Sequence, residues 1–188
     1  MKTALIFLLL ILATVSCFAK TFSSPDKQYE VKIVRETMPG ADPEDLFTLI
    51  LKDRKKTITK IPTSGYLLGA KWSPDRNYVA VNNRIGNSGD YLWVFSLPEG
   101  KVLKRPDDQT ATQWWKASSL AIQEQNPRAT DENFNRAWLT GKEWDAKGRL
   151  IVKVHTLFYS EGGFSYFLTV DVKDEFRILD RQIKKMAD

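Results

Sequence analysis

Polar and apolar residues alternate along the first part of the chain that carries a clear pattern. Tyr29, Val31 and Ile33 alternate with polar neighbours, and a period of two is typical of a strand with one buried face. Short apolar runs bounded by turn-forming residues follow at 46–51, 57–61, 67–72, 78–82, 91–97, 101–104, 139–144, 149–158, 164–172 and 175–181. This pattern predicts an all-β chain of antiparallel strands.

A polar turn that leads into a strand is repeated along the chain. Ser-Pro-Asp occurs at 24–26 and at 73–75, and Tyr29 and Tyr78 follow at the same spacing. Asp145 begins a weaker third copy, with Leu150 at the position of the tyrosine. Repeats of this length indicate stacked or radially arranged β units. We therefore expect three antiparallel meanders, at about 22–61, 67–104 and 139–181.

The second unit also resembles a known repeat. Residues 70–81, which read AKWSPDRNYVAV, and 90–95, which read DYLWVF, resemble a blade of the WD40-like propellers of the TolB and prolyl-oligopeptidase type. The good match covers 67–104, and Arg76 stands where that family usually has glycine. The resemblance implies four-stranded blades that bind peptides or proteins, without catalytic residues. Propellers close with about four to eight blades, so three units imply an incomplete or irregular array, a ring closed by several copies, or a local likeness only.

The segment 105–138, between the second and third units, has a different period. Thr110 and Gln113 have the spacing of a capping box, and Pro127 ends the helix that this spacing predicts. One face of that helix would carry Trp114, Ala117, Leu120 and Ala121. Asp131 is expected to begin a second short helix carrying Phe134 and Trp138. The chain is thus predicted to be a β array with a short α-helical insert.

The N-terminus has the pattern of an export signal. Lys2 precedes an uninterrupted apolar stretch at 4–13, which is too short to span a bilayer as a permanent anchor. Small residues at Cys17 and Ala19 suit cleavage before Lys20. We expect a signal peptide at 1–19 and a single secreted or periplasmic domain at 20–188. Cleavage before Cys17, followed by lipidation, is the alternative, and only then would the protein be anchored in a membrane.

Charge and motif content narrow the possible activities. The net charge of +5 is mild and dispersed, which does not favour nucleic-acid binding. His155 is the only histidine, and it is expected to be a strand residue satisfied by a neighbour rather than a general base or zinc ligand. Phosphate-binding loops and nucleophile elbows are absent from the sequence. We expect no catalytic residues, metal or cofactor, although acidic pairs at 44–45 and 107–108 leave a carboxylate hydrolase open.

Aromatic and basic residues of the insert are the candidate binding residues. Trp114 and Trp115 are adjacent, so a helix would bury them unequally: one could be an exposed platform, or both could be buried. Arg128, Arg136 and Trp138 complete the candidate set. The predicted function is an exported, non-enzymatic β-repeat domain that binds a protein or cell-envelope component. The alternatives are a small secreted hydrolase and a structural subunit that completes a propeller as a homo-oligomer.

Overall fold

The computed structural model describes residues 21–36, 46–53, 56–63, 66–84, 90–104, 109–159 and 161–185, which form three antiparallel sheets of four strands each. The expected signal peptide at 1–19, with Cys17, and the acidic pairs at 44–45 and 107–108 lie outside these residues. The first sheet contains β1 (Thr21–Ser23), β2 (Tyr29–Glu36), β3 (Leu46–Asp53) and β4 (Thr57–Thr63). The second contains β5 (Tyr66–Trp72), β6 (Tyr78–Arg84), β7 (Asp90–Ser96) and β8 (Lys101–Lys104).

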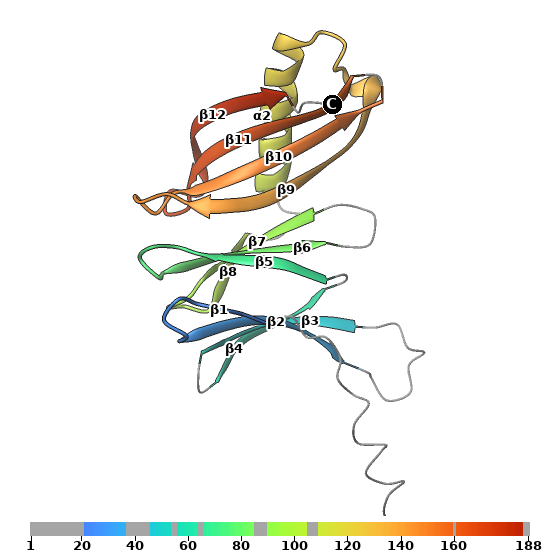
Figure 1. Ribbon diagram of the computed structural model, residues 1–188. Coiled ribbons are helices and arrows are strands. Elements are labelled where there is room, and N and C mark those ends of the chain that lie inside the picture. Colours follow the sequence, from blue (N-terminus) through green and yellow to red (C-terminus); the bar gives the residue numbers. More distant parts are fainter. Residues whose placement is uncertain are drawn as a thin grey trace, which may run out of the picture.

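The third sheet has the longest strands. It contains β9 (Phe134–Trp144), β10 (Leu150–Phe158), β11 (Gly162–Asp171) and β12 (Arg177–Lys185). In every sheet, strands that are neighbours in the sequence pair with each other, which is the order of a propeller blade. The sheets are stacked in sequence order, as Figure 1 shows. The predicted fold class, three blade-like meanders with a helical insert, is confirmed, and the array is open rather than a closed ring.

Two apolar cores lie between the stacked sheets. The core between the first and second sheets contains Val31, Leu51, Val81 and Phe95. The core between the second and third sheets contains inward-facing residues of β6, β7, β10 and β11, together with Trp114 from the insert. Because side chains alternate along a strand, the second sheet contributes one face to each core.

Helix α2 (Gln109–Gln125) covers the part of the third sheet that the second sheet does not reach. At one end of the helix, Trp114 joins the core between the second and third sheets. Towards the other end, Ile122 packs in a cluster with Phe158 and Phe164. The helix and the second sheet therefore cover the same face of the third sheet, as the view in Figure 1 also indicates. The opposite face has no sheet or helix against it among the described residues.

The second half of the insert differs from the prediction. A short 3-10 helix, η1 (Asp131–Asn133), takes the place of the expected second α-helix, and β9 begins immediately afterwards at Phe134. Phe134 and Trp138 therefore lie on a strand. Their spacing of four suits a helix, but on the strand a β-bulge between them places Phe134 on the helix-covered face, opposite Phe158, and Trp138 on the other face, opposite His155. The spacing alone could not distinguish a helix from a strand here.

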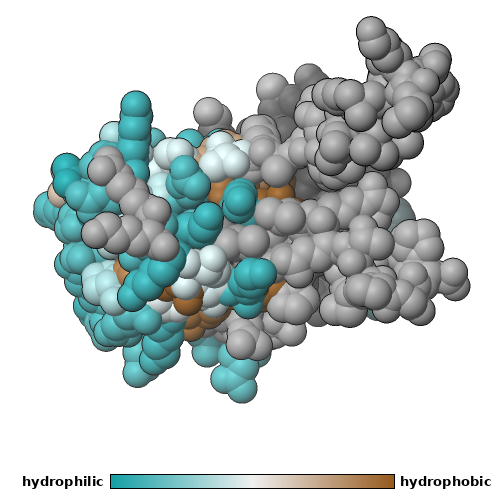
Figure 2. All heavy atoms as spheres, turned by 90° about the horizontal axis from the view of Figure 1, so that it is seen from below, coloured by the Kyte–Doolittle hydropathy of each residue, from teal (hydrophilic) through white to brown (hydrophobic). Residues whose placement is uncertain are grey.

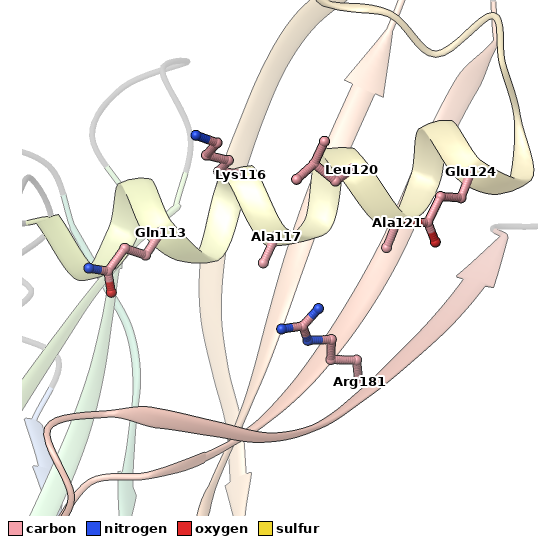
Figure 3. A pocket seen from close by; sticks show the side chains of 7 residues that line it. All are labelled: Gln113, Lys116, Ala117, Leu120, Ala121, Glu124 and Arg181. Carbon is pink, nitrogen blue, oxygen red and sulfur yellow. The ribbon is translucent and has the colours of Figure 1, made fainter.

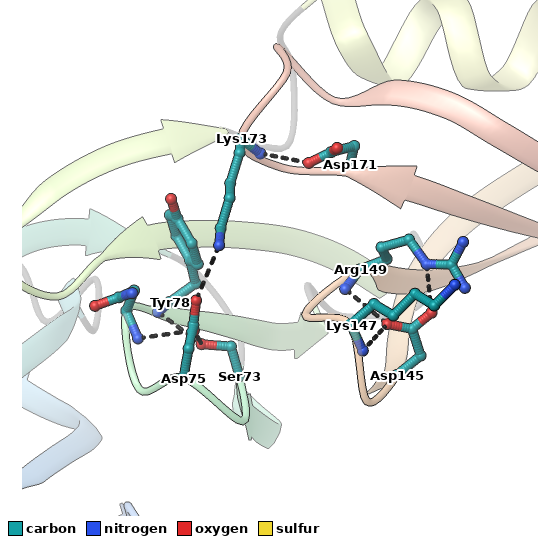
Figure 4. A network of polar contacts seen from close by, with 9 residues as sticks. Ser73, Asp75, Tyr78, Asp145, Lys147, Arg149, Asp171 and Lys173 are labelled. Carbon is teal, nitrogen blue, oxygen red and sulfur yellow. Dashed lines mark hydrogen bonds and ion pairs between the residues drawn. The ribbon is translucent and has the colours of Figure 1, made fainter.

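The repeated Ser-Pro-Asp turn has the same hydrogen bonds in its first two copies (Figure 4 shows the second). The Ser73 hydroxyl donates to Asp75 Oδ1 at 2.7 Å and accepts the Tyr78 backbone N–H at 2.9 Å. Ser24 makes the equivalent bonds at 2.6 and 3.0 Å. Arg76, at the usual glycine position, has a φ of 60°, the left-handed conformation that favours glycine. The departure from the family pattern thus leaves the turn geometry unchanged.

The third turn is one residue shorter than the other two. The Asp145 N–H donates to the Arg149 carbonyl at 2.9 Å, whereas the Ser73 N–H donates to the carbonyl of Tyr78 at 2.9 Å. A single Asp145 oxygen accepts the N–H groups of Lys147 and Arg149, which combines the roles of the serine and the aspartate. Arg149, rather than Leu150 as predicted, therefore occupies the tyrosine position of the repeat.

An aromatic stack joins each pair of neighbouring sheets. Tyr29 of the first sheet stacks on Trp72 of the second, with ring centroids 6.2 Å apart. Tyr78 of the second sheet stacks in the same way on Trp144 of the third, at 5.9 Å. The two tryptophans each end the first strand of their sheet, directly before the turn. The repeated sequence feature is therefore also the contact that holds consecutive sheets together.

Candidate functional site: the outer face of the third sheet

The pairing of the strands defines which side chains lie on the uncovered face of the third sheet, here called the outer face. His155 pairs with Trp138 of β9 and Ser165 of β11, and Lys153 pairs with Thr140 and Phe167. Paired residues and residues two apart point the same way. Among the described side chains, the outer face therefore contains Arg136, Trp138, Thr140, Glu143, Ile151, Lys153, His155, Leu157, Gly163, Ser165, Phe167, Thr169, Asp171, Arg177, Asp180 and Gln182.

The outer face carries four large apolar side chains among its polar and charged residues. Trp138, Ile151, Leu157 and Phe167 are each partly exposed, although no other element covers them among the described residues. Lys153 and, at the end of β11, Asp171 are the charged side chains on the two central strands of this face. A sheet face of this kind usually packs against another layer, because uncovered apolar surface is costly in water.

Arg136, Trp138 and His155 form one cluster at the side of the outer face. The Arg136 guanidinium carbon lies 5.4 Å from the centroid of the Trp138 ring, a cation–π arrangement. The rings of Trp138 and His155 are 4.3 Å apart between centroids. Trp138 thus has an arginine beside it on the solvent side and a histidine beside it on the sheet.

The histidine is a packed residue of this cluster. Its relative exposure is 9%, and its Nδ1 lies 3.4 Å from the Ser165 hydroxyl. A Cβ at Gly163 would lie 3.2 Å from His155 Cε1, which is closer than ordinary contact. His155 shares its face of β10 with Ile151, Lys153 and Leu157. The surroundings of its ring fit the interpretation of a strand histidine with a neighbouring partner.

The structure separates the remaining candidate residues from this cluster. Trp114 is 1% exposed and packs edge-on to Phe176, so it supports the core and offers no surface to a partner. The buried Lys104 ammonium lies 5.2 Å from its ring centroid. Trp115 is 39% exposed on α2, and Arg128 is exposed in the turn after the helix. Of the five candidates, only Arg136 and Trp138 are in contact with each other.

The outer face of the first sheet, at the other end of the array, has a different character. The strand pairing places Glu30, Lys32, Lys52 and Lys60 on it. Figure 2 views the molecule from this side, and hydrophilic side chains predominate on the described part of the surface, with small hydrophobic areas between them. Long charged side chains keep such a face solvated. The two ends of the array are therefore not equivalent surfaces.

A second candidate site is a hollow between α2 and the edge strand β12, and its residues were not predicted as a site. It has a volume of about 370 Å³ and is lined by Gln113, Lys116, Ala117, Leu120, Ala121, Glu124 and Arg181 (Figure 3). Six of these residues lie along one flank of the helix. One residue of this hollow differs from its expected position. Leu120 was expected on the same helix face as Trp114, but it is 53% exposed and lines the hollow.

Electrostatic effects at the turns are structural. Partial burial opposes ionisation of Asp75, but hydrogen bonds from the Ser73 hydroxyl and the Asn77 N–H, together with Lys173, outweigh it and lower its pKa to about 2. The Lys173 ammonium is 3.2 Å from Asp75 Oδ2. Burial raises the pKa of Tyr166, beneath α2. The Asp75 shift reflects contacts that hold the turn, and the Tyr166 shift reflects burial in the core.

The described residues give no indication of a metal centre. Within the ranges that the structure describes, no three His, Cys, Asp or Glu side chains gather closely enough to hold a metal ion. Over the same ranges, no helix has the length and apolar content required to cross a membrane.

Comparisons with known proteins give matches among solved structures, at low identity. No protein-family model matches the sequence, and no curated protein matches it. The β-propeller domain of the trilobed protease from Pyrococcus furiosus, described as having an open velcro topology, is 14% identical, with a TM-score of 0.41 over 89% of this chain and 43% of its own. TolB from Acinetobacter baumannii is 13% identical, with a TM-score of 0.35 over 81% of this chain and 38% of its own. This chain spans less than half of either structure, and its propeller-like fold rests on its own three sheets.

Proposed function

We propose that this protein is an exported, non-enzymatic binding domain that contacts a protein or cell-envelope component through the outer face of its third sheet. The observation that carries the proposal is the group of partly exposed apolar side chains on that uncovered face, with Arg136 and Trp138 at its side. Partly exposed aromatic residues beside an arginine are the side chains that contribute most to protein interfaces.

The contrast with the first sheet supports this choice of surface. Among the described residues, both terminal sheets lack a neighbouring sheet on one side, but the partly exposed aromatic residues Trp138 and Phe167 lie on the outer face of the third, whereas the strand pairing places Lys32, Lys52 and Lys60 on that of the first. Charged residues are depleted at the centres of interfaces, whereas aromatic residues are enriched there. The third sheet therefore has the composition of a binding face, and the first sheet has that of a solvent-facing end.

Closure into a ring by identical copies is less well supported. The stack between neighbouring sheets joins a tyrosine of one sheet to a tryptophan of the next. The first and third sheets each have one unmatched position of this stack. In the first sheet, Ser23 stands where the later sheets have tryptophan, and in the third sheet, Arg149 stands where the earlier sheets have tyrosine. A homo-oligomer that repeated the internal contact would need aromatic residues at both places. The outer face is accordingly expected to bind a different partner.

Capture from an envelope extract with immobilised protein, residues 20–188, tests the proposal. Phe167→Ser and Trp138→Ala alter the outer face, and Lys32→Ser is the matched change on the first sheet. We expect the first two variants to keep a folded melting transition and to lose a partner that the wild type and Lys32→Ser capture. The partner, once purified, is then titrated directly against each variant.

Two results would contradict the proposal. If both outer-face variants are folded and bind the purified partner as the wild type does, the outer face is not the contact surface. If Trp115→Ala alone loses the partner, recognition lies on the helix instead.

Export is tested separately by N-terminal sequencing of the secreted or periplasmic protein. A chain that begins at Lys20 is expected from the small residues at Cys17 and Ala19. A chain that begins at a lipid-modified Cys17 would retain export but change the anchor. A protein that stays in the cytoplasm with residue 1 intact would contradict the export proposal.

A further inference from the structure

Helix α2 extends beyond the edge of the sheet that it covers. The third sheet ends at β12, which pairs only with β11 and is therefore an edge strand. Arg181 of β12 pairs with the buried Leu168 and so lies on the face that α2 covers. The groove between α2 and β12 continues from this face, as Figure 3 shows, with Arg181 directed towards the helix between Ala117 and Ala121.

The helix flank over this groove has apolar residues at positions that would be buried if the sheet continued beneath them. Ala117 and Ala121 are partly exposed, and Leu120 is 53% exposed. On the far side of the helix from the groove lies Trp115, about 140° from Leu120 at 100° per residue. The exposed Leu120 side chain therefore lines the groove, at a position that a fifth strand beside β12 would cover.

The charges beside the groove favour an acidic occupant. Lys116 and Arg181 line it from the helix and from the strand, and neither side chain has an ion-pair partner among the described residues. Glu124 is the one acidic residue of the lining. A carboxylate placed beside Arg181 would gain a charge-assisted hydrogen bond, and a basic side chain in the same position would be repelled.

We propose that this groove binds an extended, acidic peptide segment of a partner protein, which pairs with β12 as a fifth strand. The backbone groups on the open side of an edge strand are available for such pairing. Apolar side chains of the peptide pack against Ala117 and Leu120, and an acidic side chain reaches Arg181. This site is independent of the outer face, because the groove lies on the opposite, helix-covered face of the third sheet.

Fluorescence anisotropy with labelled eight-residue peptides tests the site on the protein of residues 20–188. One probe alternates valine with glutamate, and its counterpart alternates valine with lysine. We expect binding of the glutamate peptide only, weakened about tenfold or more by Arg181→Glu, because like charges brought together oppose association strongly. Lys147→Glu makes the same charge change at an exposed turn position and is expected to bind as the wild type does.

Two N-methylated forms of the glutamate peptide test the strand pairing. Successive N–H groups of an extended peptide point to alternate sides, so methylation of alternate residues blocks one edge at a time. We expect one methylated form to lose binding and the other to retain it. Binding that survives both methylations, equal binding of the lysine peptide, insensitivity to Arg181→Glu, or no binding at millimolar peptide would each overturn the proposal.

Discussion

The two interfaces between sheets share one set of contacts and differ in another. Each has a tyrosine–tryptophan stack, and each has an ion pair that joins the turn of one sheet to the next: Asp26 to Arg76 and Asp75 to Lys173, both at 3.2 Å. These shared contacts come from the repeated turn. They show how a short sequence repeat specifies the stacking of successive units, because the same residues form the turn and contact the neighbouring sheet.

The second interface contains polar contacts for which the structure shows no counterpart among the described residues of the first. Asn82 donates to the Gly141 carbonyl and accepts the Gly141 N–H, both at 2.8 Å. The Trp144 indole donates to the Lys71 carbonyl at 2.8 Å. Asn82 follows Tyr78 by four residues, and the apolar Ile33 follows Tyr29 by the same number. The longer third sheet is thus fixed by directional hydrogen bonds and by α2, beyond the repeated contacts.

The largest expected effect concerns the helix at the second interface. Trp114→Ala removes a fully buried ring and should lower the free energy of unfolding by about 3–5 kcal/mol, the range for large aromatic truncations in a core. Trp115→Ala, its partly exposed neighbour, should cost less than about 1 kcal/mol. Urea denaturation of both variants gives the comparison, and equal losses would show that α2 does not pack as described.

The next effect concerns the Asn82–Gly141 hydrogen bonds of the second interface, which have no counterpart among the described residues of the first. Asn82→Ala leaves the buried N–H and carbonyl of Gly141 without their partner and should cost about 2–4 kcal/mol, because unsatisfied buried groups are expensive. Ile33→Val, the matched change at the first interface, should cost about 0.5–1.5 kcal/mol. If denaturant titrations give Asn82→Ala the smaller loss, the second interface does not depend on this pair.

The strands and turns could be predicted from the sequence, but the burial of the helix could not. Strand alternation and the turn residues are local features, and they located three sheets. On α2, Ser118 is buried and donates its hydroxyl to the Trp114 carbonyl at 2.7 Å, while Leu120 is exposed. A serine whose hydroxyl bonds to a carbonyl of its own helix can be buried, so the buried side of α2 cannot be recognised from apolar residues alone. Which flank faces the sheet depends on the position of the sheet.

The candidate surfaces were predictable only in part, for the same reason. Arg136 and Trp138 were chosen from composition, and the strand that brings them together was expected to be a helix. The outer face and the groove exist because α2 covers one face of the third sheet and extends past β12. Arg181 becomes a groove residue through that packing, which joins parts of the chain about sixty residues apart. Nothing local to β12 indicates it.

A smaller effect should distinguish Asp75 from Asp26, the two turn aspartates, by how the free energy of unfolding depends on pH. The pKa of Asp75 is lowered from 3.8 to about 2, so its contribution is present above the unfolded-state value of 3.8 and is lost as the pH falls from about 4 to 2. Because the group is partly exposed, we expect about 1 kcal/mol. Asp75→Asn should flatten the acid limb of a stability–pH curve over this window, more than Asp26→Asn does. An unchanged limb would show that the ionised Asp75 carboxylate, with its bonds to Ser73, Asn77 and Lys173, does not stabilise the fold.

The smallest expected effect compares the turns themselves. Gly148 has a φ of 75° at the position where Arg76 has 60° and Lys27 has 58°. A Cβ added at Gly148 would meet only Asp75 Oδ2, at 3.9 Å, so Gly148→Ala adds left-handed strain without a clash. We expect a loss of about 1 kcal/mol. Arg76→Gly should gain less than that, because relief of the same strain is partly offset by the lost ion pair with Asp26. Thermal melts of the two variants should therefore shift in opposite directions, and shifts of the same sign would mean that the left-handed turn residue does not limit the stability of these units.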